Sequence, residues 1–456
     1  MAGTATRTAG RRVAARTGVL LALVAVVAGV SVVVPNDPWH DFFDLRVYRG
    51  AVASWLDGRE LYDFTYGRSP YGFTYPPFSA LLVLPMGLLP YPVVAAGHVL
   101  LNVVVLAGLT RWLVVPLARR HGWPLPWAWL WALPLVFVVE PVRETIGFGQ
   151  VNLFLLALVL ADVVLLRRGS RWAGVGIGLA AAVKLTPGLF VVWLLLTRRW
   201  RAARVAVGTA AAATLLAFAV APATSWRFWT ETLWQTERVG RLDKTSNQSL
   251  LGALARLADP GDPSRLVWAV LAAAALAFVL TRAVRATRAG DDLAGVTLTG
   301  LAACLVSPVT WSHHLVWLVP ALVVLVDVAA GAPTAPGTPH GRRGLAGALA
   351  ALTALVLASS SIWFAEARPG HHHDLGVAGI VVEDLYLLVT LAVVALLPAR
   401  GHAVSARARG RRPPGRADGT APPNGGTAPG RGAHRQAGSD GARTTAPSPP
   451  GGSSPR

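Results

Sequence analysis

Acids, arginines and tyrosines are concentrated between Asp41 and Pro77, whereas the flanking sequence is mostly Leu, Val and Ala. The stretch begins with two carboxylates, Asp41 and Asp44, and ends on an aromatic-proline run that starts at Tyr75. A polar segment with ionisable groups beside a membrane-embedded bundle is a candidate functional site. Asp44, in the sequence Phe-Phe-Asp-Leu-Arg-Val-Tyr, has apolar neighbours that could raise its pKa and make it a general base.

A structural role is the alternative for Asp44. Its side chain could cap a helix or pair with Arg46 or Arg49. Asp41 and Asp37 compete for the role of base, and Asp37, which precedes a proline, fits a turn best. Residue type alone leaves these alternatives open.

Four amide side chains are candidates for binding acceptor hydroxyls: Gln150, Asn152, Asn247 and Gln248. Helix capping and close packing are the alternative roles for the first two. Tyr75 could stack on the C–H face of a sugar or belong to the aromatic belt of the membrane interface.

Lys184 lies between two half-length apolar segments, in the sequence Ala-Ala-Val-Lys-Leu-Thr-Pro-Gly. A lysine at membrane depth is costly unless it is paired or faces water. Snorkelling to the interface is one explanation, and a cavity or phosphate-binding role is the other.

His313 and His314 stand at the start of a predicted helix. Adjacent residues point about 100° apart on a helix and make a poor pair of ligands for one metal. We therefore expect one histidine to contact a phosphate or hydroxyl and the other to be structural. Cys304 is the only cysteine, which excludes an intramolecular disulfide and a Cys-based metal site, and no metal is predicted.

The elements that must position these residues are membrane helices. Hydrophobic residues make up 53% of the chain and charged residues only 14%, against roughly 25% charged in soluble proteins. A crossing helix needs about 20 apolar residues, fewer where one end lies in protein or water. Twelve transmembrane segments are predicted, over residues 17–34, 91–116, 127–140, 150–166, 173–183, 187–197, 203–221, 266–286, 293–306, 312–329, 344–364 and 382–398. The apolar segment 78–90 contains two prolines and fits an interfacial or re-entrant piece.

Arginines predict the orientation of these segments. With the N-terminus inside, every predicted cytoplasmic loop carries at least two arginines, as the positive-inside rule requires. The net charge of +19 is therefore a topology signal, and no nucleic-acid partner is predicted. The polar stretches then fall together on the extracytoplasmic side of a plasma membrane: 35–77, 143–150, 184–187, 222–264, 307–314 and 365–381.

Two domains are predicted. Residues 1–400 form the membrane domain, and its first apolar run is interpreted as an uncleaved helix because it is long for a signal peptide and lacks a clear cleavage site. Residues 401–456 consist of Gly, Pro, Ser, Thr, Ala and Arg, so they are expected to form a disordered cytoplasmic tail.

Six short motifs follow one another in a recognisable order: Asp-Leu-x-Val-Tyr, Tyr-Pro-Pro-Phe, Gly-Gln-Val-Asn, Lys-Leu-Thr-Pro, Asn-Gln-Ser-Leu and Ser-Pro-x-x-Trp-Ser-His-His. With about twelve helices, they resemble glycosyltransferase family 87, the actinobacterial polyprenyl-phosphate-mannose-dependent α-(1→2)-mannosyltransferases of the GT-C superfamily. The resemblance covers roughly residues 15–398. It implies a GT-C-type bundle whose extracytoplasmic loops form the site.

The resemblance also implies a mechanism. The family's base is an aspartate of the first extracytoplasmic loop, a position that Asp44 fits. The donor would be polyprenyl-phosphate-mannose, with no cofactor, and the acceptor an envelope glycolipid or glycan. Cations that could stabilise the departing phosphate are Lys184, His313, His314 and Arg143. A single displacement would invert the anomeric centre. The alternatives are a GT-C enzyme for another sugar such as arabinofuranose, a protein O-mannosyltransferase, and a lipid or sugar transporter.

Overall fold

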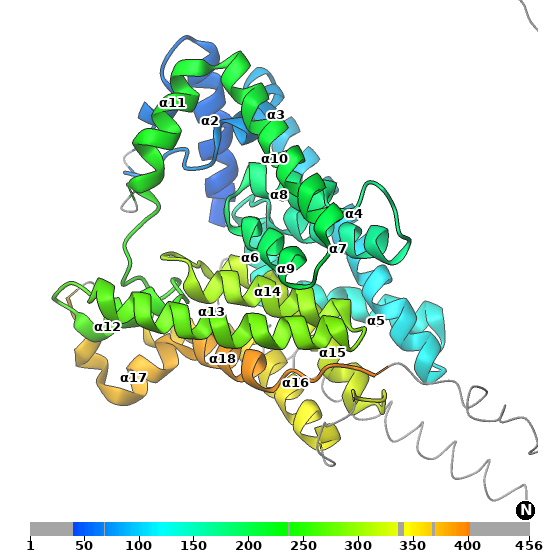
Figure 1. The fold of residues 1–456 in the computed structure, drawn as a ribbon. Coiled ribbons are helices and arrows are strands. Elements are labelled where there is room, and N and C mark those ends of the chain that lie inside the picture. The colour runs from blue at the N-terminus through cyan, green and yellow to red at the C-terminus, as the bar shows by residue number, and fades with distance from the viewer. Residues whose placement is uncertain (1–39, 68, 236–237, 336–341, 367–369, 402–456) are drawn as a thin grey trace, which may run out of the picture. The chain divides into compact units, whose positions relative to one another are not determined.

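The computed structural model describes residues 40–401 apart from 68, 236–237, 336–341 and 367–369. In this part of the chain every regular element is a helix (Figure 1). The N-terminal half comprises η1 (His40–Phe42), α2 (Phe43–Leu56), η2 (Leu61–Asp63), α3 (Pro77–Leu88), α4 (Tyr91–His121), α5 (Leu125–Val138), α6 (Glu140–Gly147), α7 (Asn152–Arg167), α8 (Val175–Val183), η3 (Thr186–Gly188), α9 (Leu189–Leu196) and α10 (Trp200–Val220). The C-terminal half comprises α11 (Pro222–Thr230), η4 (Thr232–Trp234), α12 (Leu250–Ala258), α13 (Arg265–Arg288), α14 (Asp292–Val306), η6 (Ser312–Trp317), α15 (Leu318–Ala329), α16 (Arg342–Ala358), η7 (Ser361–Ala365), η8 (His372–Leu375), α17 (Gly376–Glu383) and α18 (Leu385–Leu396).

The described helices establish a polytopic membrane protein. Five helical segments are long and apolar enough to cross a bilayer: Tyr91–His121, Trp200–Val220, Arg265–Arg288, Ser312–Ala329 and His372–Leu396. The pair α5–α6, bent by 70°, makes a sixth if it counts as one span. Eleven of the twelve predicted segments coincide with helices, but α8 and α9 have only 9 and 8 residues and are too short to cross singly. The predicted segment 17–34, Asp37 and the tail from residue 402 lie outside the described residues.

The polar stretch 35–77 was expected to be a loop, and the structure corrects this expectation. It contains the 14-residue helix α2, which packs against α3. Leu45, Tyr48 and Val52 repeat at helical spacing and are buried on one face of α2. The polar residues between them obscured this period in the sequence. The stretches 222–264 and 365–381 likewise contain α11, α12 and α17.

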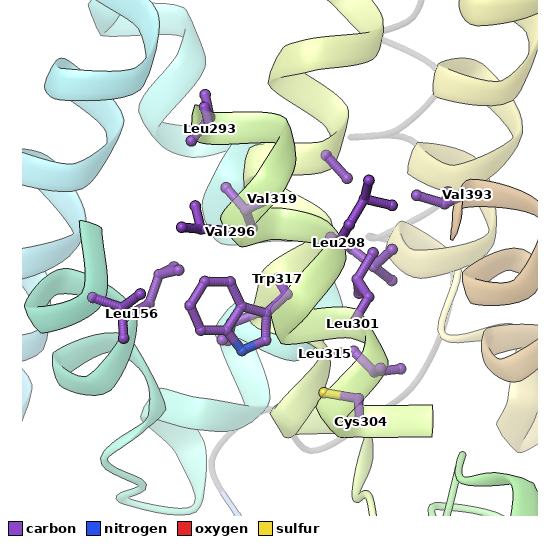
Figure 2. Close-up of a cluster of buried hydrophobic side chains, with 14 of the residues drawn as sticks. Leu156, Leu293, Val296, Leu298, Leu301, Cys304, Leu315, Trp317, Val319 and Val393 are labelled. Carbon is purple, nitrogen blue, oxygen red and sulfur yellow. The ribbon is translucent and has the colours of Figure 1, made fainter. Parts of the chain in front are cut away.

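Helix α14 forms the centre of the main apolar core. All its residues from Asp292 to Leu305 are buried, and Figure 2 shows its side chains beside Trp317. Gly300 permits this approach, because a Cβ atom there would lie 2.1 Å from the Trp317 ring. Cys304 Sγ also lies 3.5 Å from the carbonyl oxygen of His314. These contacts fix η6, and with it the two histidines, against the core.

Ion pairs join the helix ends that the arginine pattern places on the cytoplasmic side. Asp327, at the end of α15, is buried and accepts hydrogen bonds from Arg120, His121 and Arg400. Arg400 also binds Asp291, which caps α14 by accepting from the Ala294 amide. The polar stretches predicted for the other side meet one another, as the next subsection describes. The contacts therefore group the loops as the topology prediction does.

Arg256 of α12 supplies a test of the packing of α12 against the junction between α17 and α18. Its side chain is fully buried, donates 2.8 Å to the Lys244 carbonyl oxygen, and pairs with Asp384. Removing one partner of a buried ion pair leaves an uncompensated charge and costs about 3–5 kcal/mol. We expect Arg256→Ala to lower the thermal unfolding midpoint in detergent by several degrees. The exposed Arg265, at the start of α13, is the control, and an equal loss in Arg265→Ala would contradict this role.

Candidate active site

Asp44 lies in the first turn of α2, and the segment Phe148–Gln150 is held directly against it. The Leu45 amide donates 3.2 Å to the Phe148 carbonyl oxygen. Gly149 has φ +79°, and a Cβ there would lie 2.4 Å from Leu45 Cβ, so only glycine allows the two segments to meet. This close approach places the Gln150 side chain in hydrogen-bonding contact with the Asp44 carboxylate.

The surroundings of Asp44 suit a general base. Burial by neighbouring protein raises the pKa of the carboxyl to about 6, and the Gln150 hydrogen bond and the positive charge of Lys184 oppose this rise only in part. A base is most effective when its pKa lies near the working pH. The carboxylate can therefore be ionised near neutrality and still gain a proton readily.

The rival carboxylate, Asp41, is placed differently. Its side chain is 80% exposed, and its Oδ1 accepts from Arg46 Nη2 at 2.7 Å. Arg49 donates to the Leu89 carbonyl oxygen at 3.0 Å. The two arginines that could have paired with Asp44 are thus engaged elsewhere, and the residue that begins the helix as its cap is Phe42.

Tyr75 lies between Gln150, which contacts Asp44, and Lys184. Its hydroxyl donates 2.8 Å to Gln150 Oε1 and accepts from the Tyr48 hydroxyl at 3.1 Å. Its carbonyl oxygen accepts from the Tyr62 hydroxyl at 2.9 Å. Burial raises the pKa of both Tyr48 and Tyr75, so both stay neutral hydroxyls. The tyrosine ring faces Lys184, whose Nζ lies 5.3 Å from the ring centroid.

Lys184 stands in the break between α8 and η3 and contacts three other elements of the site. Its Nζ lies 3.3 Å from Asn152 Oδ1 and 2.8 Å from His314 Nε2. Asn152 is oriented by its own amide, which donates 3.0 Å to the His313 carbonyl oxygen. The lysine therefore does not snorkel away from the protein, and it faces Asp44 across the site.

The two histidines have different surroundings. His314 contacts Lys184 through Nε2, and its Nδ1 accepts from the Trp311 backbone amide at 3.2 Å. The His313 ring packs 5.3 Å from the Phe148 ring, and both its ring nitrogens are buried without a hydrogen-bond partner in the described part of the chain. Orphaned buried nitrogens are costly, and the described residues supply no partner for those of His313.

Three predicted residues lie outside this cluster. Arg143 donates 2.6 Å to Ser360 Oγ and lies 4.0 Å from Glu140 Oε2, with no contact to Asp44 or Lys184 among the described residues. Asn247 and Gln248 are fully buried.

The side-chain amides of Asn247 and Gln248 are hydrogen-bonded to backbone groups. Asn247 Nδ2 donates to the carbonyl oxygens of Leu242 and Pro308, and Gln248 Nε2 donates to those of Thr245 and Glu383. Because both N–H groups of each amide are used, the side chains hold the loop together. The structure does not support hydroxyl binding by either residue.

Sequence reasoning missed Tyr48 and the pair His40–Glu144. Tyr48 is one helical turn after Asp44, a relation that becomes visible only once α2 is known to be a helix. His40 Nε2 lies 2.7 Å from Glu144 Oε1, and its ring stacks on Phe148 at 4.0 Å. This pair lies beside Asp44, whose pKa the histidine helps to lower. No local pattern joins residues 104 positions apart.

A small cavity of about 40 Å³ lies behind Lys184, lined in part by Asn152, Thr186, Cys304 and His314. It has room for ordered water but not for a glycosyl phosphate. Asp44, Tyr75 and Lys184 are only half-buried, so part of each residue remains exposed.

Fold and site together define an α-helical membrane protein with a desolvated carboxylate facing a partly buried cation. The profile of glycosyltransferase family 87 matches residues 73–308, which include Tyr75, Gln150, Asn152 and Lys184. The chain belongs to this family and is a glycosyltransferase. The resemblance inferred from the motifs is thereby confirmed.

Curated relatives carry more specific names. A polyprenol-phosphate-mannose-dependent alpha-(1-2)-phosphatidylinositol mannoside mannosyltransferase of Mycobacterium tuberculosis is 36% identical over 301 residues, covering 62% of this chain and 69% of the relative. The Mycolicibacterium smegmatis protein of the same name is 37% identical over 63% of this chain and 70% of its own length. A polyprenol-phosphate-mannose-dependent alpha-(1-2)-phosphatidylinositol pentamannoside mannosyltransferase of Mycolicibacterium smegmatis is 32% identical over 82% of this chain and 89% of the relative. No solved structure matches the chain.

Proposed function

We propose that this protein transfers mannose from polyprenyl-phosphate-mannose to a hydroxyl of a phosphatidylinositol mannoside or a related envelope glycolipid, forming an α-(1→2) bond. The donor, the linkage and the acceptor class follow the printed names of relatives that span 62–82% of this chain. The observation that carries the proposal is the desolvated Asp44 carboxylate, linked through Gln150 and Tyr75 to Lys184.

Asp44 is the proposed general base. It removes the proton of the acceptor hydroxyl as the oxygen attacks the anomeric carbon. The bond from that carbon to the phosphate oxygen breaks, and its electron pair stays on the phosphate. Attack and departure on opposite faces invert the centre, so a β-linked mannosyl phosphate gives an α-mannoside.

Lys184, His313 and His314 are the proposed phosphate-binding residues. A polyprenyl phosphate is already a good leaving group, so stabilising its charge matters more than protonating it. Lys184 and His314 are in direct contact, and both ring nitrogens of the neighbouring His313 lack a hydrogen-bond partner among the described residues. Gln150 and Asn152 orient the base and the cation. Asn152 donates its N–H groups to the His313 carbonyl oxygen and to Thr145 Oγ1, so of these two amides only Gln150 is proposed to bind an acceptor hydroxyl.

We further propose a GT-C-type bundle of about twelve transmembrane helices in the plasma membrane, with both termini in the cytoplasm, a tail over 401–456, and an extracytoplasmic site. The grouping of the polar stretches on one side, and of the ion-paired helix ends on the other, supports this orientation. Nucleotide sugars are cytoplasmic, so a site on the outer face requires a lipid-linked donor.

The activity is tested with purified protein in nanodiscs, radiolabelled polyprenyl-phosphate-mannose and phosphatidylinositol mannosides as acceptors. We expect a labelled glycolipid that an α-(1→2)-specific mannosidase degrades. Transfer from polyprenyl-phosphate-arabinose alone would favour another sugar, and labelled peptide would favour protein O-mannosylation. Donor movement across proteoliposomes without transfer would indicate a transporter.

The orientation is tested by cysteine labelling, which the chain allows because its only cysteine, Cys304, is buried. Asp57 and Arg288 are both exposed, on opposite sides in the predicted topology. In intact cells, a membrane-impermeant maleimide should label Asp57→Cys fully and Arg288→Cys only after permeabilisation. The reverse pattern would place the site in the cytoplasm.

The pH dependence of kcat/KM should reveal the base. Because Asp44 acts as a carboxylate and its pKa is raised to about 6, activity should fall about tenfold per pH unit below 6 and level off between pH 7 and 8. Gln150→Met removes a hydrogen bond that lowers this pKa, so its acidic limb should move to higher pH. An unchanged limb in Gln150→Met would contradict the assignment.

A further inference from the structure

The hydrogen-bonding partners of Lys184 and His314 determine which of their nitrogens carry hydrogens. The backbone amide of Trp311 can only donate, and it points at His314 Nδ1 from 3.2 Å. Nδ1 must therefore accept and carries no hydrogen. In a neutral imidazole the hydrogen is then on Nε2.

The Nε2–H group faces Lys184 Nζ at 2.8 Å. An ammonium group has three donors and no acceptor, whereas an amine has a lone pair. Only the uncharged lysine can accept from Nε2–H, while an N–H of that amine points to Asn152 Oδ1 at 3.3 Å. All the hydrogen bonds of the pair are satisfied in this one protonation state.

A charged lysine would break this arrangement. It would have to donate to Nε2, which moves the imidazole hydrogen to Nδ1, directly against the Trp311 amide hydrogen. Two facing donors lose a hydrogen bond and repel each other. Cys304 Sγ lies 3.5 Å from the His314 backbone carbonyl oxygen, and the His313 ring packs edge-on against the His314 ring at 4.7 Å, which restricts rotation of the His314 side chain.

Groups on the neighbouring elements do not restore the charge. Asp44 on α2 and Cys304 on α14 raise the pKa of Lys184, but burial outweighs both and lowers it to about 8. The remaining neighbours are the neutral hydroxyl of Tyr75, the Asn152 amide and the imidazole of His313. His40 lies beyond them, near Asp44 and His313.

We infer that Lys184 gives up its proton readily in the empty site, so that it is largely an uncharged amine above pH 8, and that it is held as an ammonium ion when the phosphate of the donor binds. The second half of this statement rests on the proposed function. A phosphate oxygen replaces the lysine nitrogen as acceptor for His314 Nε2–H. The freed lone pair of Lys184 then takes a proton from solvent, and the ammonium pairs with the phosphate.

Because Lys184 is held as an ammonium ion when the phosphate binds, its positive charge is present together with the negative charge that it stabilises. The donor is a phosphodiester with one negative charge, and cleavage leaves a monoester that gains a second charge. The acceptor proton goes to Asp44, while the proton on Lys184 was gained on binding, so both are accounted for. An empty site without the ammonium charge also avoids the cost of an unpaired buried cation.

The state of the empty enzyme can be measured directly, because the chain contains only two lysines, Lys184 and Lys244. Lys244→Arg keeps a cation beside Tyr71 and Trp311 and leaves Lys184 as the only lysine. With ¹³C at lysine Cε, NMR of this variant without substrate should show a titration midpoint of about 8. A midpoint near the ordinary value of about 10.4 would overturn the inference.

Coupling to the donor is tested by calorimetry with a short-chain isoprenyl phosphomannose in two buffers of different ionisation enthalpy. Binding at pH 8 should take up about half a proton per site, because about half of the lysines are then uncharged. Lys184→Arg should bind the probe with no uptake, since arginine stays charged. Equal uptake in both proteins overturns the coupling. Failure of the native enzyme to bind the probe overturns the donor assignment, whereas the titration of the empty enzyme stands independently.

Discussion

Asp44→Asn is expected to lower kcat by about 10²–10⁴-fold, because the amide cannot accept the proton of the attacking hydroxyl. The substitution preserves the size of the side chain and its first-turn position in α2. The measurement is initial-rate transfer from the lipid-linked donor by purified protein. Thermal unfolding of the same preparation shows whether the loss is chemical.

Asp41→Asn is the matched control for this substitution. It removes a carboxylate three residues away, but one that is 80% exposed and paired with Arg46. Surface pairs contribute only about 0–1 kcal/mol, so activity should stay within a few-fold of the native value. If Asp44→Asn kept near-normal turnover while Asp41→Asn lost activity, the general base would be Asp41 and not Asp44.

Lys184→Ala is expected to lower kcat/KM for the donor by about 10²–10³-fold. Removing a group that stabilises developing charge in a desolvated site typically has this effect. The acceptor KM should change much less, because the lysine contacts Asn152, His314 and the Tyr75 ring on the side assigned to the phosphate.

Lys244→Ala controls for a general loss of positive charge. Lys244 is exposed, and its Nζ lies 4.9 Å from the Tyr71 ring centroid and 5.9 Å from that of Trp311. Its loss should leave donor kinetics within a few-fold of native. Equal losses for donor and acceptor in Lys184→Ala would argue against a phosphate role.

Local sequence sufficed for the class of the protein. Apolar length identifies membrane helices and arginine placement predicts their sides, because each depends only on residues next to one another along the chain. The family followed from six short motifs in order, and the profile match over 73–308 confirms it. Two expectations were less accurate: α8 and α9 lie where they were predicted but are too short to cross singly, and α2 was taken for a loop.

The roles of individual residues needed the tertiary structure. Asp41 and Asp44 look alike in sequence, and only packing shows that one is exposed and the other shielded by Gln150. Arg143 and Asn247 looked equally suitable for the site, yet both bind other partners.

The chain by itself thus determined a multi-helix membrane glycosyltransferase and predicted that its polar motifs gather on one side. Only the folded structure decided that Asp44 is the shielded carboxylate and that Lys184 meets His314, 130 residues away. The physical reason is that a pKa and a proton position depend on desolvation and on hydrogen bonds between distant segments. Those contacts exist only after Gly149 and Gly300 have let the helices approach.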